Sequence, residues 1–346
     1  MFEPNSAIAS LPKIQLHCHL EGTLRPETFV ELTQRYGIST RYRPGADDVA
    51  GPTDPAEVYR FADFNEFLLT FAAVSRSLAS PDDYARLARE FVADAIAQNV
   101  LYGELFISPS VWSFFNRELD VPATIRSVIA ELNAVSNTAF SLIVDVTRNF
   151  GAESAMRTAR IASDLAGEGV IGIGLGGDEA RFPAPLFEDV FAFARAQGLN
   201  VVAHAGEAAG AHSVRDAIEV LGAQRIGHGV RALEDASVVE LLRERRIPLE
   251  ICPTSNFLTG AASREHPHPL RELDAAGVVI AIDADDPTLF GTSISDEYRF
   301  VADEMGLEAL HRFIRQAVDA SFLAPEAKQA LHARVSAELK RPLAKS

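Results

Sequence analysis

Short apolar runs alternate with longer amphipathic stretches along most of the chain. The runs are rich in valine and isoleucine and nearly continuous in their apolar character, which is typical of parallel strands covered on both faces. The segments between the runs are mostly long enough to hold a crossover helix. The pattern predicts strands within residues 13–22, 99–109, 140–150, 170–179, 200–207, 225–230, 247–256 and 278–287.

Eight strand–helix units in a row favour a closed barrel over an open sheet. We therefore predict an α/β fold, a (β/α)8 TIM barrel that forms a single domain over residues 1–346. The stretch from Tyr36 to Val92 holds more helical sequence than one crossover helix requires. We predict that this stretch adds an extra helical lid insertion after the first strand.

Charge and cysteine content limit the expected partners and compartment. The net charge of −16 repels phosphate backbones and anionic lipid, so we expect no nucleic acid and no membrane as partners. No window reaches the roughly 18 apolar residues of a membrane span, and the N-terminus has no signal-peptide pattern. Cys18 and Cys252 support no disulfide framework and suit a reducing compartment. We expect a soluble cytoplasmic protein.

Ionisable residues gather at the C-terminal ends of the predicted strands. In a β/α barrel these ends form one rim, on which active sites are built. Charged groups that converge on one rim repel each other or need partners, so stability alone does not explain them. The rim is therefore the predicted functional site.

His17 and His19 stand two residues apart on the first predicted strand. Period-2 geometry points both imidazoles to the same face, into the barrel mouth, while Cys18 faces the outer helices. Two imidazoles side by side suit a divalent metal such as zinc. Considered alone, the pair is explained equally well by a structural role or by chance.

The fifth and sixth strands also end in candidate residues. His204 ends the fifth strand, and Glu207 follows it after Ala205 and Gly206, which are small enough for a sharp backbone turn. Such a turn lets Glu207 fold back over a metal. His228 ends the sixth strand between two glycines. The structural alternatives are a lone rim histidine with a solvated glutamate, and a packed core histidine.

Asp285 and Asp286 end the eighth strand. Adjacent side chains point in opposite directions, so one carboxylate can bind a metal while the other faces a substrate. The run Asp-Asp-Pro is also an ordinary helix start, with Asp286 as the N-cap. The joint pattern favours the functional interpretation, because strands one, five, six and eight all deliver such groups to the same rim.

The positions of the lysines bear on the number of metal ions. Two-metal sites on related barrels usually need a bridging ligand, often a modified lysine at the end of strand four. A single metal held by three histidines and Asp285 fits better here and leaves a position for water. No lysine lies in residues 170–179, since the lysines are Lys13, Lys328, Lys340 and Lys345.

Six motifs follow one another in order: PKIQLHCHLEGTL (12–24), GLGGDE (174–179), HAGE (204–207), RIGHG (225–229), CPTSN (252–256) and DADDP (283–287). Together they resemble the motifs of the adenosine/adenine deaminase family of the amidohydrolase superfamily. The resemblance runs from about Leu11 to Phe300. It implies one Zn²⁺ per chain and a small-molecule substrate, a 6-aminopurine that loses its 6-amino group as ammonia. The oligomeric state stays open.

The resemblance also implies a role for each rim residue. The implied zinc ligands are His17, His19, His204 and Asp285. The implied catalytic residues are Glu207, which handles protons at ring N1, His228, which orients and deprotonates the attacking water, and Asp286, which contacts N7. The implied substrate contacts further include the backbone N–H of Gly177 at N3, with His19, Glu21 and the apolar lid residues Phe67, Leu68 and Phe71.

Two departures from the family pattern concern the sugar side. The adenosine branch usually has aspartate where this chain has Glu21, and histidine where it has Asn149. The run Gly177-Asp178-Glu179 is nucleoside-like, whereas adenine enzymes often read Ser-Ser-Glu there. We expect adenosine or a 5′-modified adenosine such as 6-amino-6-deoxyfutalosine as substrate, with free adenine as the alternative.

Three other functions compete with this interpretation. Another amidohydrolase activity is disfavoured by the missing strand-four lysine and by the presence of Glu207. A cytidine-deaminase-type enzyme needs a Pro-Cys-x-x-Cys run, which the sequence does not contain. A metal-binding barrel without catalysis would first lose Glu207, His228 or Asp285, and all three residues are present.

Overall fold

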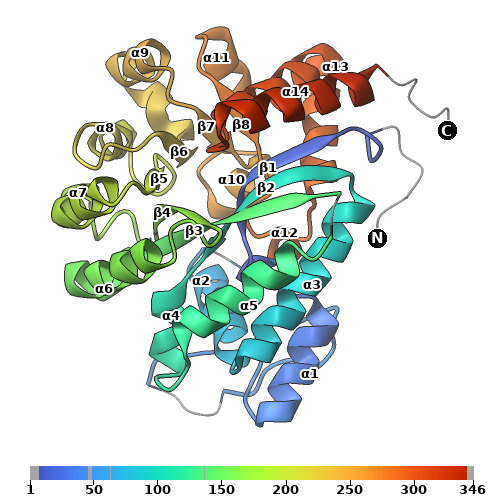
Figure 1. The fold of residues 1–346 in the computed structure, drawn as a ribbon, viewed down its shortest axis with the longest axis vertical. Helices are drawn as coiled ribbons and strands as arrows, with labels where there is room; N and C mark the ends of the chain where they lie inside the picture. Colours follow the sequence, from blue (N-terminus) through green and yellow to red (C-terminus); the bar gives the residue numbers. More distant parts are fainter. Residues whose placement is uncertain (1–7, 46–48, 63, 136, 341–346) are drawn as a thin grey trace.

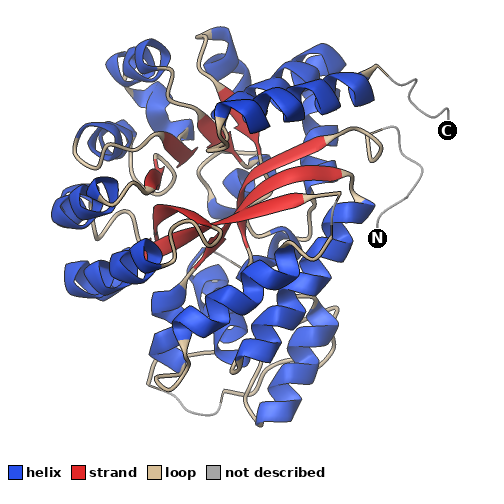
Figure 2. Ribbon diagram, viewed as in Figure 1, coloured by secondary structure: helices blue, strands red, loops and turns tan. Residues whose placement is uncertain are grey.

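The computed structural model describes residues 8–45, 49–62, 64–135 and 137–340. Its strands form one parallel sheet in which each strand pairs with the next along the chain. They lie at the centre of the molecule, with helices around them (Figures 1 and 2). The strands are β1 (Lys13–His19), β2 (Val100–Ile107), β3 (Ala139–Thr147), β4 (Val170–Gly176), β5 (Asn200–Ala205), β6 (Arg225–His228), β7 (Leu249–Ile251) and β8 (Ile280–Ile282).

The chain after β8 returns to β1 and brings the two edges of the sheet together. The His19 N–H donates to the carbonyl oxygen of Asp285 at 2.9 Å, and the Asp285 N–H donates to that of His17 at 3.1 Å. These bonds satisfy backbone groups that an open sheet would leave unpaired. The predicted (β/α)8 TIM barrel is therefore confirmed.

The helices cover the outside of the barrel, and α6 to α9 follow one another around it (Figure 1). Their starts follow local rules: Ser80 and Asp83 form a capping box at α3, and Pro26 occupies the first turn of α1. The helices are α1 (Pro26–Tyr36), α2 (Phe64–Ser77), α3 (Pro81–Ala97), α4 (Pro109–Phe115), α5 (Val121–Leu132), α6 (Gly151–Asp164), α7 (Glu188–Ala196), α8 (Ala211–Glu219), α9 (Ala236–Arg245), α10 (Pro253–Thr259), α11 (Leu270–Ala275), α12 (Pro287–Phe290), α13 (Ile294–Ala320) and α14 (Pro325–Leu339).

The connection from β1 to β2 holds α1, α2 and α3, where one crossover helix would suffice. Additional helices therefore occur in the region where the sequence predicts an insertion. Helix α2 contacts α4 and the short 3₁₀ turn η1 (Glu21–Thr23) directly after β1. This contact places α2 beside the C-terminal end of β1. That helix α2 acts as a lid stays a prediction.

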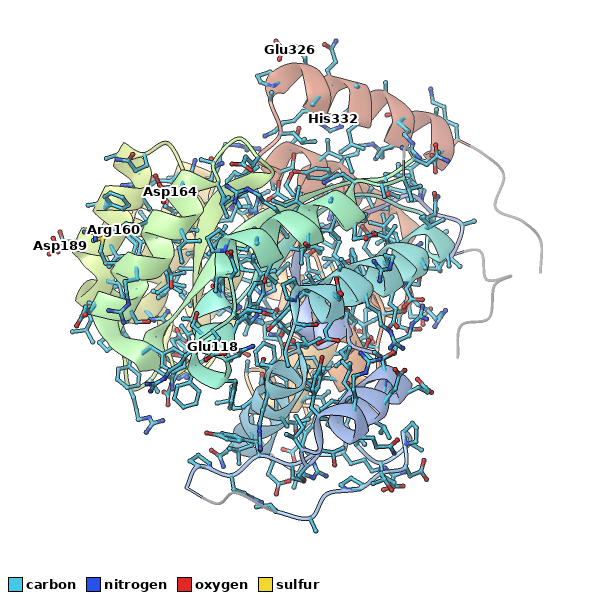
Figure 3. The ribbon with its side chains drawn as sticks, turned by 60° about the horizontal axis from the view of Figure 1, so that its bottom comes forward. Glu118, Arg160, Asp164, Asp189, Glu326 and His332 are labelled. Carbon is cyan, nitrogen blue, oxygen red and sulfur yellow. The ribbon has the colours of Figure 1, made fainter. Side chains whose placement is uncertain are left out.

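The core has two layers. Between the strands and helices lies a large apolar layer that includes Cys18, as its place on the outward face of β1 predicts. Inside the barrel, Phe106, Ile143 and Val202 form a small separate cluster. Glu118, which Figure 3 labels, is among the charged side chains exposed on the outside. None of the described helices is long and apolar enough to cross a membrane.

Candidate active site

A cavity of about 360 Å³ opens at the C-terminal ends of the strands. Its floor holds ionisable side chains from four strand ends, as the rim pattern in the sequence predicts. Its walls come from the ends of β3 and β4 and from helices α2 and α4. The predicted site residues that line it are His19, Phe67, Leu68, Phe71, Gly177, His204, Glu207, His228, Asp285 and Asp286.

Three imidazoles and one carboxylate face a common point beneath this cavity. The Nε2 atoms of His19 and His204 lie 3.0 Å apart. The Oδ1 atom of Asp285 lies 3.5 Å from the Nε2 atoms of both His17 and His19. Ligands about 2.0–2.1 Å from a tetrahedral zinc ion are separated by about 3.3 Å, so these distances fit one ion. His17 Nε2 is fully buried without a hydrogen-bond partner, as expected of a nitrogen that awaits a metal.

The cluster also reaches His228. The ligand atoms of His17, His204, His228 and Asp285 all lie within 4.8 Å of one another. His228 Nε2, however, also faces Glu207 Oε2 at 3.6 Å, and its Nδ1 pairs with the side-chain amide of Asn256 at 3.0 Å. This position, between Glu207 and the cluster, suits a base that contacts a water molecule.

Hydrogen bonds on the far side of the rings fix which imidazole nitrogen faces the cluster. His17 Nδ1 lies 2.7 Å from Glu250 Oε2, and His204 Nδ1 lies 3.2 Å from the carbonyl oxygen of Leu175. A proton held on Nδ1 leaves the Nε2 lone pair free for a metal. Glu250 is held in turn by Arg225, whose Nε donates to it at 2.5 Å.

Burial keeps these imidazoles out of water. Burial lowers the pKa of His19 to about 3 and lowers the pKa of His204 well below its usual value. Both rings are therefore neutral at physiological pH. Only the neutral form binds a metal.

The turn after β5 holds Glu207 over the cluster. Gly206 has φ +70°, a conformation that glycine adopts without strain. The Glu179 carboxylate accepts from four successive backbone N–H groups, those of Gly206, Glu207, Ala208 and Ala209. The Glu207 side chain is 13 % exposed, and its burial raises the pKa of its carboxyl. Glu207 is thus positioned as a proton donor.

The two aspartates after β8 have different surroundings. Asp285 has φ +61°, which is unusual for a side-chain-bearing residue and typical of functional sites. Although burial opposes ionisation, hydrogen bonding to His17 and the nearby histidines hold the pKa of Asp285 well below its usual range. Burial beside Asp285 raises the pKa of Asp286, whose Oδ1 is buried without a partner. Asp286 stands at the N-cap position of α12, as the alternative interpretation expected, but its side chain makes no capping hydrogen bond.

Glu21 lies behind the cavity wall and is not among the residues that line the cavity. It is fully buried, and its Oε1 accepts from the Ser108 N–H at 2.8 Å and from the indole N–H of Trp112 at 2.6 Å. Its Oε2 is buried without a hydrogen-bond partner. The predicted contact of Glu21 with the substrate stays a prediction. Asn149 does line the cavity, and its Oδ1 accepts from the Asp178 N–H at 3.0 Å.

The sequence did not predict a role for several residues around the site. Glu250 lies within a short apolar run outside the motifs, and Arg225 opens the RIGHG motif without an assigned role, although a charged residue inside a strand was an available signal. Ser255, which donates to Asp285 Oδ2 at 2.6 Å, stood within the CPTSN motif without an assigned role. Asp145 lines the cavity and ends no predicted run.

Comparison with known proteins agrees with this geometry. The model of the adenosine deaminase family matches residues 12–338. An aminodeoxyfutalosine deaminase from Streptomyces avermitilis is 38% identical over 97% of this chain and 92% of its own. An adenine deaminase from Rhizobium leguminosarum is 35% identical over 94% and 99%, and an adenosine deaminase from Shewanella loihica is 36% identical over 94% and 98%.

Solved structures share the whole fold. The adenine deaminase from Arthrobacter aurescens has a TM-score of 0.84 at 28% identity, covering 96% of this chain and 100% of its own. An amidohydrolase from Burkholderia ambifaria with bound Zn has 0.83 at 26%, covering 98% and 93%. The N6-methyl-AMP deaminase from Arabidopsis thaliana has 0.82 at 27%, covering 96% and 98%. The chain therefore belongs to the adenosine deaminase family and is a hydrolytic deaminase that acts on C–N bonds.

Proposed function

We propose that this protein is a zinc-dependent deaminase of a 6-aminopurine nucleoside, with a 5′-modified adenosine such as 6-amino-6-deoxyfutalosine as the preferred substrate. The observation that carries the proposal is the cluster of His17, His19, His204 and Asp285, which faces Glu207 across a single cavity. The zinc-bearing neighbour supports the choice of metal. The relatives support a purine as substrate.

The residues of the cavity divide the chemistry among them. Zinc held by the cluster would lower the pKa of a bound water to about 7. His228 accepts the proton of the water as it adds to C6, and Glu207 donates a proton to ring N1, where negative charge develops. A carboxylic acid in a buried site keeps its proton at higher pH than an exposed one, in agreement with the raised pKa of Glu207. His228 then passes the water proton to the 6-amino group, which leaves as ammonia, while the C6 hydroxyl gives its proton back to Glu207 as the 6-oxo group forms.

The base is oriented by groups on two sides of the ring. Asp286 would contact N7, and the Gly177 N–H would contact N3. Gly177 has φ +94°, and a side chain at this position would meet Asn149 Oδ1, so glycine is required for the backbone to face the cavity. A ring held at both edges and at N1 presents C6 to the cluster of His17, His19, His204 and Asp285.

The outer part of the cavity favours an apolar extension beyond the base. Aromatic residues line it: Tyr42, Phe114, Phe115 and Phe150. Among the described lining residues there is no lysine or arginine, and the nearby Arg43 already faces Glu66 at 3.8 Å. A 5′-phosphate would lose its hydration here without a cationic partner, which is costly. An aromatic 5′ substituent fits better, and the carboxylate that the 5′ group of 6-amino-6-deoxyfutalosine carries would have to reach solvent beyond these rings.

Free adenine is the second candidate. Relatives named adenine deaminase are nearly as similar as those named for nucleosides. Glu21 does not line the cavity, and its Oε1 already accepts from Ser108 and Trp112, so Oε2 alone is left to bond a 5′-hydroxyl. The apolar outer cavity would then lack an occupant, which favours the larger substrate.

A substrate panel tests the proposal. We expect kcat/KM to be highest for an adenosine with an aromatic 5′ extension, lower for adenosine, and lowest for adenosine 5′-monophosphate. Ammonia release from each compound is measured side by side with free adenine. A preference for free adenine would overturn the nucleoside part, and no release from any 6-aminopurine would overturn the whole proposal.

A further inference from the structure

Strand β3 presents a polar wall to the cavity. Side chains on a strand alternate between faces, and the alternate residues Asp145 and Thr147 of β3 line the cavity, as does Asn149 in the 3₁₀ turn that follows (Arg148–Phe150). Asp145 is the first of the three along the chain and is 3% exposed. The wall formed by these three residues has no role in the proposed chemistry.

Asp145 is a buried carboxyl group without a full set of partners. Its Oδ1 is enclosed and accepts no hydrogen bond. Buried polar atoms are nearly always paired, so an unpaired one that lines a cavity indicates a missing ligand. Burial, with a smaller contribution from Glu21, raises the pKa of Asp145 to about 8, so the carboxyl is largely protonated at neutral pH. In this form it both donates and accepts.

Glycines on β4 make room for this carboxyl. A Cβ atom at Gly174 would lie 2.4 Å from Asp145 Oδ1, and one at Gly176 would lie 2.3 Å from Oδ2. Gly177, which follows directly, lines the same wall. Asp145 therefore lies beside the strand end that the proposed function assigns to the N3 edge of the purine.

The walls from α2 and α4 are mainly apolar. Helix α2 contributes Phe67, Leu68 and Phe71 to the cavity, and α4 contributes Val111 and Phe114, with Ser108 at its start and Tyr42 as polar lining residues. Asp145 is the carboxyl group of the lining that lies beside the strand end assigned to the N3 edge. Next to the N3 edge, the 2′-hydroxyl is the nearest hydroxyl of a ribose attached to N9, while N3 itself would be occupied by the Gly177 N–H.

We propose that Asp145 is a specificity-determining residue that hydrogen-bonds the 2′-hydroxyl of the nucleoside. This inference rests on the proposed function, because it needs a ribose at N9. A site built to bond a hydroxyl discriminates strongly against an analogue that lacks it, since its own polar group is then left unpaired. The wild-type protein should thus prefer adenosine to 2′-deoxyadenosine.

The test compares Asp145→Ala with the wild-type protein on adenosine, 2′-deoxyadenosine and free adenine. We expect kcat/KM for adenosine to fall by about 10–100-fold while the value for 2′-deoxyadenosine changes little. Asp145→Asn, which retains a donor and an acceptor, should recover part of the loss. Asp164→Ala, at an exposed acidic position labelled in Figure 3, is the matched control.

The outcomes separate the two proposals. Equal losses on adenosine and 2′-deoxyadenosine, or no loss on either, would overturn the role of Asp145. A loss confined to free adenine would also overturn it, since the carboxyl would then bond N9–H. A wild-type protein that is inactive on every 6-aminopurine would instead overturn the proposed function. Activity of Asp145→Ala on 2′-deoxyadenosine shows that the variant folds.

Discussion

Two side-chain-bearing residues in left-handed backbone conformations stand at the centre of the site. His228 ends β6 and has φ +64°, and Asp285, a short distance after the end of β8 at Ile282, has φ +61°. Such conformations cost of order 1–3 kcal/mol each and persist where surrounding contacts impose them. Here Asn256 and Ser255, both from α10, hold the two side chains. The strain coincides with the residues to which the chemistry is assigned.

Replacement of Glu207 by glutamine removes the proton donor and keeps the shape of the side chain. We expect Glu207→Gln to lower kcat by about 10²–10⁴-fold, the usual contribution of general acid–base catalysis. The metal content should be unchanged, because Glu207 is not among the assigned ligands. Asp285→Ala, in contrast, should lose metal and activity together. Near-normal turnover of Glu207→Gln would contradict the proton transfer.

The pH dependence of kcat extends this prediction. The pKa of Glu207 is raised by burial, so its protonated form persists to higher pH than in an ordinary glutamate. The rate that depends on proton donation is full below this raised pKa and falls as the pH rises through it. This alkaline limb should be absent from the residual activity of Glu207→Gln. A limb at the ordinary glutamate pKa of about 4.3 would contradict the assignment.

Glu250 positions His17, which is assigned as a ligand of the proposed zinc. It accepts from His17 Nδ1 and is itself held by Arg225. We expect Glu250→Gln to weaken zinc binding about 10–100-fold, as is typical for loss of a partner behind a metal ligand. Zinc affinity is measured by competition with a chelator. Glu240→Gln, at an exposed ion pair with Arg243, is the control, and equal affinities of the two variants would contradict this role.

At the scale of secondary structure, α2 lines the cavity and packs against the barrel through its aromatic side chains. Phe67 stacks on Phe290 of α12 with ring centroids 4.7 Å apart, and Phe71 packs edge-on against His19 at 6.2 Å. These two contacts hold α2 beside the cluster of His17, His19, His204 and Asp285. The arrangement explains how a helix outside the regular barrel pattern presents apolar side chains to the site.

Neighbouring leucines on α2 provide a matched pair of variants. Leu68 lines the main cavity, whereas Leu69 lines a separate crevice beside Arg41 and Arg43. We expect Leu68→Ala to lower kcat/KM for the nucleoside about tenfold through lost apolar contact. Leu69→Ala should leave kcat/KM unchanged, with melting temperatures measured for both. Equal effects of the two substitutions would show that the cover does not contact the substrate through Leu68.

At the scale of the whole molecule, the barrel and its rim could be predicted because both depend on order along the chain. Parallel strands end on one side, so His17, His204, His228 and Asp285 had to converge wherever the strands closed. The predicted runs 247–256 and 278–287 extend beyond the short strands β7 and β8, because apolar character continues into the turns.

The rest of the site depends on neighbours that the sequence does not place together. Glu250 on β7 supports His17 on β1, and the unpaired carboxyl of Asp145 is explained only by the space that Gly174 and Gly176 leave on the adjacent strand. The position of Glu21 in the first motif predicts a sugar contact. The sequence does not show that one oxygen of Glu21 accepts from the indole N–H of Trp112.

The central claim is that one zinc ion per chain drives hydrolytic deamination of a 6-aminopurine nucleoside. The most direct measurement is ammonia release from adenosine by metal-stripped protein as zinc is added back, with bound metal counted in the same samples. Activity should be lost on stripping and should rise in proportion to bound zinc up to one equivalent. Activity that survives stripping, or that needs a second equivalent, would contradict the account.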